Sequence, residues 1–584
     1  MLAINSERKG VRDMPKITLN NVTVSDAYMA LLANRGIDYW FANAGTDFAP
    51  VVEALAKAQV LETKVPTAVT CPHENTAMHM AIGYFLVTGR PQAVMVHVNV
   101  GTANGLNGLL NAARGHVPML FTAGRTPTNE DGLAGHRSLD IHWTQEMFDQ
   151  AGMLRESVKW DYELRNSQQL ETVVDRALSI AKSEPMGPVY LSLPREVLAQ
   201  SMAEFTYTTP SRQQPAAPSV PNGDAADEVA ALLAGAENPL IITSSAGRDP
   251  KSWSALAQFA ERYALPVIQY RNRYMSLPSN HPMNLGYELK PLLDGADVIL
   301  AVDVPVPWLP AYDKVRDDAK VIHMGPDPLH GYVPVRGHPC DIALACATAE
   351  GLHVLNETMA EREAKAKTRI DKRRAALAER WKMLRENWRK KLDSVKGQTP
   401  VHPAWVSHCI NEIKGADTIL IKESPLLQEH VDISQPATLF NAGAASGLGH
   451  GLGCALGAKL AARDRLVIGT HGDGSYMFGN PISAHYVGAE QELPVLTVIF
   501  NNQRWQAVRR ATVGLHKDGY AAKSPHQPIT FLDSISNYQK AVEVADGYGE
   551  KVTDPNDVMP ALQRGLKAVT VEKRQAVINI ICAA

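Results

Sequence analysis

The chain has 584 residues, of which 45% are hydrophobic and 20% are charged, and these proportions exclude a disordered or fibrous protein. Its formal net charge of −3 offers no field for binding a polyanion such as nucleic acid. No apolar run approaches the roughly 18–20 residues that span a bilayer. The six cysteines are scattered without a CxxC pair and no secretory signal is apparent, so we expect three or four domains in a reducing, cytoplasmic compartment.

The first third of the chain alternates strand-like and helix-like segments after a polar, basic start. Residues 1 to about 20 are expected to form a loose arm. Short apolar runs then predict buried strands at 39–42, 67–71, 93–97, 119–122 and 189–193. Amphipathic helices are predicted between them, as at 75–88 and 104–114. This alternation predicts a parallel α/β domain over residues 20–200.

The middle of the chain is predicted to form a linker, a second α/β domain and a helical connector. Residues 201–224 are rich in Pro, Ser, Gln and Ala, which predicts a linker. Strands at 240–243, 266–269, 298–302 and 320–323 predict an α/β domain over 225–355. Residues 357–396 contain no Pro or Gly and mix both charge signs, which predicts a long helix. Its apolar stripe is narrow, which favours a connector over 356–397 rather than a nucleic-acid or membrane helix.

A third α/β domain is predicted over 399–584, and it contains the most informative pattern. Gly472, Asp473, Gly474 and Ser475 follow the apolar run 466–469, and Asn502 follows the run 495–500. Two neighbouring parallel strands would bring Asp473 and Asn502 together at their carboxyl ends, where open α/β sheets bind ligands. Carboxylate, amide and backbone carbonyl oxygens suit Mg²⁺ with phosphate oxygens as its remaining ligands. A helix over 482–490 can offer its amino end to the phosphates; the alternative is a plain strand–turn–helix.

This spacing resembles the signature of thiamine diphosphate enzymes, and the chain resembles the benzoylformate decarboxylase and acetolactate synthase group from about residue 20 onward. The resemblance implies three doubly wound parallel-sheet α/β domains, in the order pyrimidine-binding, central and diphosphate-binding. It also implies Mg²⁺ bound by Asp473, Asn502 and the backbone carbonyl of Arg504. The residues that it places on thiamine diphosphate are Glu74, Ser446, Leu448, Gly472, Asp473, Gly474, Ser475 and Asn502.

Leu448 lies in a glycine-rich run, 447–453, at the place of the family's bulky wedge, which bends the cofactor. The same glycines are compatible with a dinucleotide-binding turn, but such a turn should follow a strand, and the small residues 441–446 are not strand-like. After Asn502 the chain departs from the family, because Gln503, Arg504 and Trp505 replace a small Gly-Thr-type segment. We expect residues 516–527, with their Gly, Pro and charges, to form a mobile lid.

Four residues are candidates for catalysis. Glu74 follows the run 67–71 and resembles the glutamate that activates the aminopyrimidine; the alternative is a first-turn acid that complements the helix dipole. His97 lies where benzoylformate decarboxylases have a proton-transferring histidine, and its alternative is a core histidine bonded to a backbone carbonyl. Thr46 replaces a serine that contacts the substrate carboxylate, or it is a simple N-cap. His281 resembles a second decarboxylase histidine, although His-Pro pairs also occur in relatives that do not use them.

The resemblance implies a carbon–carbon lyase that decarboxylates a 2-oxo acid without oxidation through an enamine, or a carboligase that uses the same enamine. A flavin-containing, acetolactate-synthase-like or oxidase-like enzyme is a second hypothesis, although no convincing flavin-phosphate loop lies between residues 239 and 353. A non-catalytic binding protein is a third, against which Glu74, Asp473 and Asn502 argue together. The partners implied are a small 2-oxo acid or aldehyde, with no nucleic acid or membrane. A homodimer or homotetramer with active sites shared between subunits is also implied.

Overall fold

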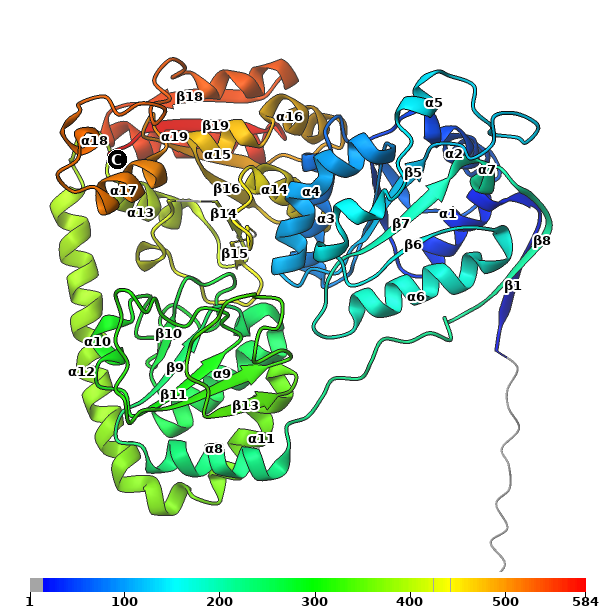
Figure 1. Cartoon of the computed structure of the whole chain (residues 1–584). Coiled ribbons are helices and arrows are strands. Elements are labelled where there is room, and N and C mark those ends of the chain that lie inside the picture. The colour runs from blue at the N-terminus through cyan, green and yellow to red at the C-terminus, as the bar shows by residue number, and fades with distance from the viewer. Residues whose placement is uncertain (1–13, 424, 442) are drawn as a thin grey trace, which may run out of the picture.

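The computed structural model describes residues 14–423, 425–441 and 443–584. Three α/β units form the chain, each built on one parallel sheet (Figure 1). The first and third units lie side by side, the central unit lies against the third, and the long helix α12 runs along one edge between them. Three parallel-sheet domains are the fold class that the sequence predicts, and the prediction is confirmed.

The N-terminal sheet has the strand order β3-β2-β4-β5-β7-β6. Its strands are β2 (Tyr39–Ala42), β3 (Thr67–Thr70), β4 (Ala93–Val96), β5 (Leu120–Arg125), β6 (Asp161–Glu163) and β7 (Val189–Pro194). The helices are α1 (Val24–Asn34), α2 (Ala49–Val60), α3 (Glu74–Thr88), α4 (Val98–Arg114), α5 (Ile141–Thr144), α6 (Leu170–Lys182) and α7 (Arg195–Leu198). Helix α4 begins six residues before the predicted 104, because tertiary packing overrides the weak helix propensity of its Gly and β-branched residues.

Two expectations about the edges of this domain are wrong. Residues 16–20 are not a loose arm, because β1 (Lys16–Thr23) pairs antiparallel with β8 (Ser201–Thr208); residues 1–13 lie outside the described residues. The predicted linker at 201–224 likewise begins with β8, where Phe205 and Tyr207 alternate into the apolar core. The Pro-rich composition starts only at residue 210, so averaging over the whole segment obscured the period-2 pattern of the strand.

The central sheet has the order β10-β9-β11-β12-β13. Its elements are β9 (Pro239–Thr243), β10 (Val267–Gln269), β11 (Val298–Val302), β12 (Lys320–Gly325), β13 (Ile342–Ala345), α8 (Gly223–Gly235), α9 (Pro250–Tyr263), α10 (Lys290–Leu293) and α11 (Thr348–Ala360). The connector α12 covers Glu363–Val395, so the predicted single helix is interrupted near Glu361. Arg362 stabilises this break by donating to the carbonyl of Thr358 and to Asp227 of α8.

The C-terminal sheet has the order β15-β14-β16-β17-β19-β18. Its strands are β14 (Ile419–Lys422), β15 (Leu439–Phe440), β16 (Val467–Gly472), β17 (Leu496–Asn501), β18 (Tyr548–Val552) and β19 (Ala576–Ile581). The helices are α13 (Pro403–Ile413), α14 (His450–Ala461), α15 (Asp473–Phe478), α16 (Pro481–Glu490), α17 (Gln506–Leu515), α18 (Tyr520–Lys523) and α19 (Val558–Thr570). None of the helices in the described ranges combines the length and the hydrophobicity of a membrane-spanning segment.

The first and third domains share one apolar core. Helix α3 packs along α14, and the cluster includes Met78 and Met80 from α3 together with Cys454 and Leu456 from α14. Both helices are buried on nearly all sides, as expected for helices without a polar face. This packing fixes the carboxyl edge of the first sheet relative to the glycine-rich turn before α14.

Candidate active site

Three predicted catalytic residues follow three neighbouring strands. Strand β2 pairs with β3 on one side and with β4 on the other, both in parallel. Thr46, Glu74 and His97 follow β2, β3 and β4 respectively. Because parallel strands end at the same edge of a sheet, the three residues meet on one edge, as the sequence predicts.

Glu74 is the first residue of α3 and only 7% of it is exposed. Asn104 of α4 donates to Glu74 Oε2 over 3.3 Å. The amino end of the helix is already capped by His73, whose Nδ1 accepts from the amide of Asn75. A solvent-exposed first-turn acid would complement the dipole from the surface, whereas Glu74 presents a buried carboxylate at the sheet edge.

His97 forms a short contact with a buried carboxylate at this edge. Its Nδ1 lies 2.5 Å from Oδ1 of Asp47, a residue that is 3% exposed. The hydrogen bond to Asp47 raises the pKa of His97 above its ordinary value; burial opposes this, and the charge of Glu74 adds to it. Its predicted alternative, a histidine bonded to a backbone carbonyl, is not what the described contacts show. On its other side, His97 Nε2 lies 3.3 Å from the amide nitrogen of Gln145.

The turn after β2 is shaped around this imidazole. A Cβ atom at Gly45 would lie 2.1 Å from His97 Nδ1, so the approach of the ring requires glycine there. Thr46 begins a short 3₁₀ helix (Thr46–Phe48) whose N-cap is Gly45, which contradicts the N-cap interpretation of Thr46. The Thr46 side chain is exposed at the edge, and its role toward a substrate stays a prediction.

His281 lies elsewhere, in the central domain, and is 8% exposed. Its Nδ1 accepts from the amide of Met283, and its Nε2 lies 3.7 Å from Glu261 of α9. The indole of Trp381 in α12 donates to its carbonyl. Burial lowers the pKa of His281. These contacts join it to the connector helix, and its predicted catalytic role is untested.

On the third domain, Asp473 and the segment after β17 meet at a second sheet edge. Strands β16 and β17 pair in parallel, with Gly472 opposite Phe500, so the predicted pairing is confirmed. Asp473 is 3% exposed; its Oδ1 accepts from the amide of Gly474, and its Oδ2 is buried with no partner among the described residues. Burial raises the pKa of Asp473, although neighbouring amides that include those of Gln503 and Arg504 lower it.

The donor set suits a divalent cation. A buried carboxylate oxygen without a hydrogen bond costs about 1–3 kcal/mol or more, and a hard cation would satisfy it. Asn502 Oδ1 accepts from the amide of Arg504, and the carbonyl of Arg504 accepts from Gln506; each oxygen keeps a second lone pair for a metal. The residues present therefore fit Mg²⁺.

The helix that follows the first half of this pattern is α15, which starts at Asp473 itself. The predicted helix over 482–490 exists as α16, but Gly479 and the left-handed Asn480 (φ 51°) separate it from α15. The amino end beside Asp473, which includes Gly474 and Ser475, therefore belongs to α15. A Cβ atom at Gly474 would lie 2.2 Å from the ring of Trp505, so the departure at 503–505 places an indole directly on this turn.

The segment after Trp505 is anchored at both ends. Arg504 forms an antiparallel bridge with Phe531, and the Trp505 amide donates to the carbonyl of Thr530. Between these anchors lie α17 and α18, with Leu515 and Tyr520 exposed. The predicted lid, residues 516–527, lies within this excursion, and its mobility stays a prediction.

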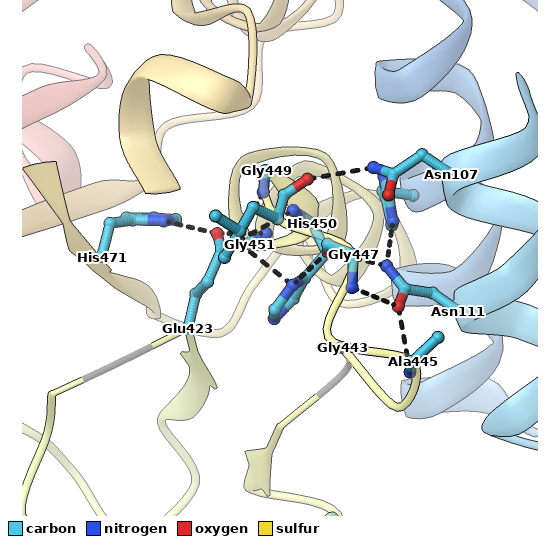
Figure 2. A network of polar contacts seen from close by, with 12 residues as sticks. Asn107, Asn111, Glu423, Gly443, Ala445, Gly447, Gly449, His450, Gly451 and His471 are labelled. Carbon is cyan, nitrogen blue, oxygen red and sulfur yellow. Dashed lines mark hydrogen bonds and ion pairs between the residues drawn. The ribbon is translucent and has the colours of Figure 1, made fainter. Parts of the chain in front are cut away.

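The glycine-rich turn that carries Leu448 is fixed from both domains (Figure 2). Three consecutive carbonyls, those of residues 447–449, accept from asparagine side chains of the first domain. Their donors are Asn111, Asn107 and Asn75 respectively, at 2.9–3.0 Å. Three consecutive amides, those of residues 449–451, donate to the carboxylate of Glu423 at 2.6–3.2 Å. Leu448 and the neighbouring Ser446 (φ 58°) thus lie in a turn with a fixed backbone.

Two histidines complete this network. His450 Nδ1 lies 3.2 Å from Glu423 Oε1, and His471 Nδ1 lies 3.3 Å from Oε2 (Figure 2). Burial alone would raise the pKa of Glu423, but His450 and His471 hold it well below its usual range. Burial lowers the pKa of His450, but the charge of Glu423 and its hydrogen bond outweigh this and raise it. The carboxylate thus links the Leu448 turn to the end of β16.

Sequence reasoning missed Asp47, Gln145 and Glu423. Asp47 directly follows Thr46, but its contact with His97 depends on the adjacency of β2 and β4. Glu423 follows the apolar run 418–421, which is a strand signal that could have drawn attention to it. Gln145 lies in the long segment between β5 and β6, where no local sequence pattern identifies it as a functional residue.

Models of thiamine pyrophosphate enzymes match all three domains. The N-terminal TPP binding domain matches residues 22–153, the central domain 226–347 and the C-terminal TPP binding domain 424–580. Together these matches cover most of the chain, in the order of the three observed units. The chain belongs to the thiamine pyrophosphate enzyme family.

Curated relatives of similar length have different activities. A sulfoacetaldehyde acetyltransferase from Castellaniella defragrans is 24% identical, over 97% of this chain and 94% of its own. A benzoylformate decarboxylase from Pseudomonas aeruginosa is 26% identical over 83% and 87%. A probable acetolactate synthase from Mycobacterium bovis is 25% identical over 85% and 87%. Identity at this level defines the cofactor family and leaves the reaction open.

The fold is also shared with solved structures. The thiamine diphosphate-dependent 4-hydroxybenzoylformate decarboxylase of Rhodococcus jostii superposes with a TM-score of 0.75 at 22% identity, over 96% of this chain and 99% of that one. This likeness concerns the fold alone.

Proposed function

We propose that this chain is a thiamine diphosphate- and Mg²⁺-dependent carbon–carbon lyase that decarboxylates a 2-oxo acid without oxidation. In this reaction the substrate loses carbon dioxide, and the carbon that held the carboxylate gains a proton to give an aldehyde. When bound, thiamine diphosphate supplies the nucleophilic carbon and electron sink for cleaving a bond beside a carbonyl. The protein must bind the cofactor, present a carboxylate to its aminopyrimidine and supply the proton.

The observation that carries this proposal is the position of His97. Its imidazole lies at the same sheet edge as Glu74, with Nδ1 engaged by Asp47 and Nε2 facing Gln145. An imidazole whose pKa is raised above its ordinary value holds a proton near neutral pH and can deliver it to carbon. Glu74 would hold the aminopyrimidine, while Asp473, Asn502 and the Arg504 carbonyl would hold Mg²⁺ and the diphosphate.

A screen for carbon dioxide release tests the reaction. The purified chain, with Mg²⁺ and thiamine diphosphate, is given a panel of aliphatic and aryl 2-oxo acids, and the products are identified by mass spectrometry. We expect at least one member to yield carbon dioxide and the matching aldehyde in equal amounts. If no member is turned over while the cofactor binds, decarboxylation is the wrong reaction.

Carboligation is the second candidate, and two observations favour keeping it. A probable acetolactate synthase and an acetyltransferase are among the relatives, and Trp505 changes the turn over Gly474 where the chain departs from the decarboxylases. Adding an aldehyde or a second 2-oxo acid to the same assay distinguishes the two functions. An acyloin or acetolactate product would identify a carboligase; free aldehyde alone would identify a lyase.

We also propose that the chain forms a homodimer or homotetramer. Large apolar side chains are exposed on both cofactor-binding domains. They include Val100, Trp143 and Phe148 on the first, and Met477, Phe478, Ile482 and Tyr486 on the third. The four on the third domain come from the successive helices α15 and α16, and a cluster of exposed apolar side chains is typical of a surface that an assembly covers. Light scattering after gel filtration should give a mass of two or four chains, and a monomer at micromolar concentration would contradict this.

A further inference from the structure

We propose that Asp47 is a positioning residue that determines which nitrogen of His97 transfers the proton. We also propose that Gln145 forms a hydrogen bond with that nitrogen in both of its protonation states. This inference rests on the proposed role of His97 in the reaction. It goes beyond that role by assigning separate tasks to the two residues that contact the imidazole.

The contacts of Asp47 account for both of its oxygens. Oδ1 lies 2.5 Å from His97 Nδ1, and Oδ2 accepts from the amide of Val98 over 3.3 Å. A Cβ atom at Gly124 of β5 would lie 1.7 Å from Oδ2, so the carboxylate is enclosed from that side as well. An ionised carboxylate only accepts hydrogen bonds, and Nδ1 must therefore carry a hydrogen. The titrating nitrogen of His97 is Nε2.

The backbone beside His97 is held in an unusual conformation. Val98 has φ 32°, a left-handed value that is rare for a β-branched residue. Such residues persist only where their surroundings fix them, and they cluster at functional sites. The bond from the Val98 amide to Asp47 is one such constraint. Asp47 thus fixes the ring and the backbone that directs it.

Gln145 suits an imidazole that gains and loses a proton at Nε2. Its amide nitrogen lies 3.3 Å from His97 Nε2, so it donates to the neutral ring. Its Oε1 is buried with no hydrogen-bond partner among the described residues. When Nε2 is protonated, turning the same amide presents this oxygen as an acceptor. One side chain therefore matches both states.

The charged and titratable groups around His97 come from three elements. Asp47 faces it from the 3₁₀ helix after β2, Glu74 from α3 and His142 from α5. Both carboxylates favour the protonated ring. Burial and then the charge of Arg195 lower the pKa of His142, which favours the neutral form of that ring beside His97. Removing the charge of Asp47 should therefore make His97 lose its proton at lower pH.

The test compares Asp47→Asn and Gln145→Glu with wild type, and uses Asp131→Asn, an exposed aspartate of the same domain, as the control. With ¹⁵N-histidine labelling, the His97 signals are identified by their loss in His97→Gln. We expect the wild-type ring to carry its neutral-state hydrogen on Nδ1. Asp47→Asn should shift its titration to lower pH, Gln145→Glu should shift it to higher pH, and Asp131→Asn should leave it unchanged.

Kinetics then connect this titration to the reaction. We expect kcat to fall about 10²–10⁴-fold in Asp47→Asn, the pH limb assigned to His97 to move in the direction of the NMR shift, and the cofactor Kd to stay the same. An unchanged tautomer and titration in both variants would overturn the proposal. If Asp47→Asn does not fold, an upward shift in Gln145→Glu supports it and no shift overturns it. The NMR result stands even if no 2-oxo acid is turned over, so a failure of the proposed function is seen separately.

Discussion

The carboxylate of Glu423 lies 3.2 Å from the imidazole of His450, and the two side chains are only 1% and 6% exposed. The same carboxylate accepts hydrogen bonds from three consecutive backbone amides of the Leu448 turn. A buried anion with this many donors is strongly stabilised, and removing its charge leaves all of them with a weaker partner.

We expect Glu423→Gln to lower the free energy of unfolding by about 3–5 kcal/mol, the range for breaking a buried charged pair. The amide can accept with only one of its two groups, so at least one backbone N–H of the turn loses its partner. Chemical denaturation at pH 6 measures the change. Glu379→Gln on the exposed face of α12 is the control, and an equal loss in both variants would contradict the prediction.

The same pair makes stability depend on pH in two directions. The lowered pKa of Glu423 contributes stability that is complete above about pH 4.3 and is lost as pH falls toward the folded-state value. The raised pKa of His450 contributes stability that is complete below about pH 6.5 and is lost as pH rises through its folded-state value. Thermal unfolding measured across pH should show the loss on the alkaline side in wild type, and Glu423→Gln should lack the His450 part of it.

Glu74→Gln should separate cofactor activation from cofactor binding. The amide keeps the shape of the side chain and its contact with Asn104, but it cannot accept a proton. We expect hydrogen–deuterium exchange at C2 of bound thiamine diphosphate to slow about 10²–10⁴-fold, with the Kd from calorimetry changed only a few-fold. Glu53→Gln on α2, an exposed residue of the same domain, should exchange like wild type. Fast exchange in Glu74→Gln would assign activation to another group.

Asp473→Asn should not destabilise the ligand-free protein, but it should abolish the stabilisation that Mg²⁺ and the cofactor give. Without them, the unpartnered buried Oδ2 is replaced by an uncharged group, so the free energy of unfolding should stay the same or rise. With Mg²⁺ and cofactor at 100 times the wild-type Kd, wild type should gain about 2.7 kcal/mol and the variant almost nothing. Differential scanning fluorimetry with and without both ligands reads this out, and Asp464→Asn in the turn before β16 is the control. An equal thermal shift in Asp473→Asn would remove it from the metal site.

His97→Ala should slow aldehyde formation about 10²–10⁴-fold, because it removes the proposed proton source. Its cofactor Kd should remain near that of wild type, since Glu74, Asp473 and Asn502 are untouched. Single-turnover measurements of carbon dioxide and aldehyde show which step is affected. Unchanged rates of both products would remove His97 from the mechanism.

Local patterns in the sequence were sufficient to predict much of the fold and one side of the site. The runs before Glu74, His97, Asp473 and Asn502 are short and largely apolar or β-branched, and each forms a strand of a parallel sheet. Position at the carboxyl end of such a strand follows from sequence alone.

Contacts between elements could not be predicted in this way. The contact of Asp47 with His97 depends on β2 lying beside β4, and the carboxylate of Glu423 reaches a turn 26 residues further along the chain. The break between α11 and α12 contains neither Pro nor Gly and depends on tertiary contacts of Arg362. The average composition of residues 201–224 does not reveal strand β8, because this segment begins with a strand and ends with a Pro-rich stretch.

The pairing of Lys16–Thr23 with Ser201–Thr208 sets the order in which the chain can complete its first domain. During synthesis, β1 leaves the ribosome early and its partner strand leaves almost two hundred residues later. The edge of β1 therefore stays unpaired until Thr208 has left the ribosome. Open edges invite pairing with other chains. A fragment that stops at residue 200 would keep the main sheet and expose that edge permanently, whereas one that stops at residue 210 would close it.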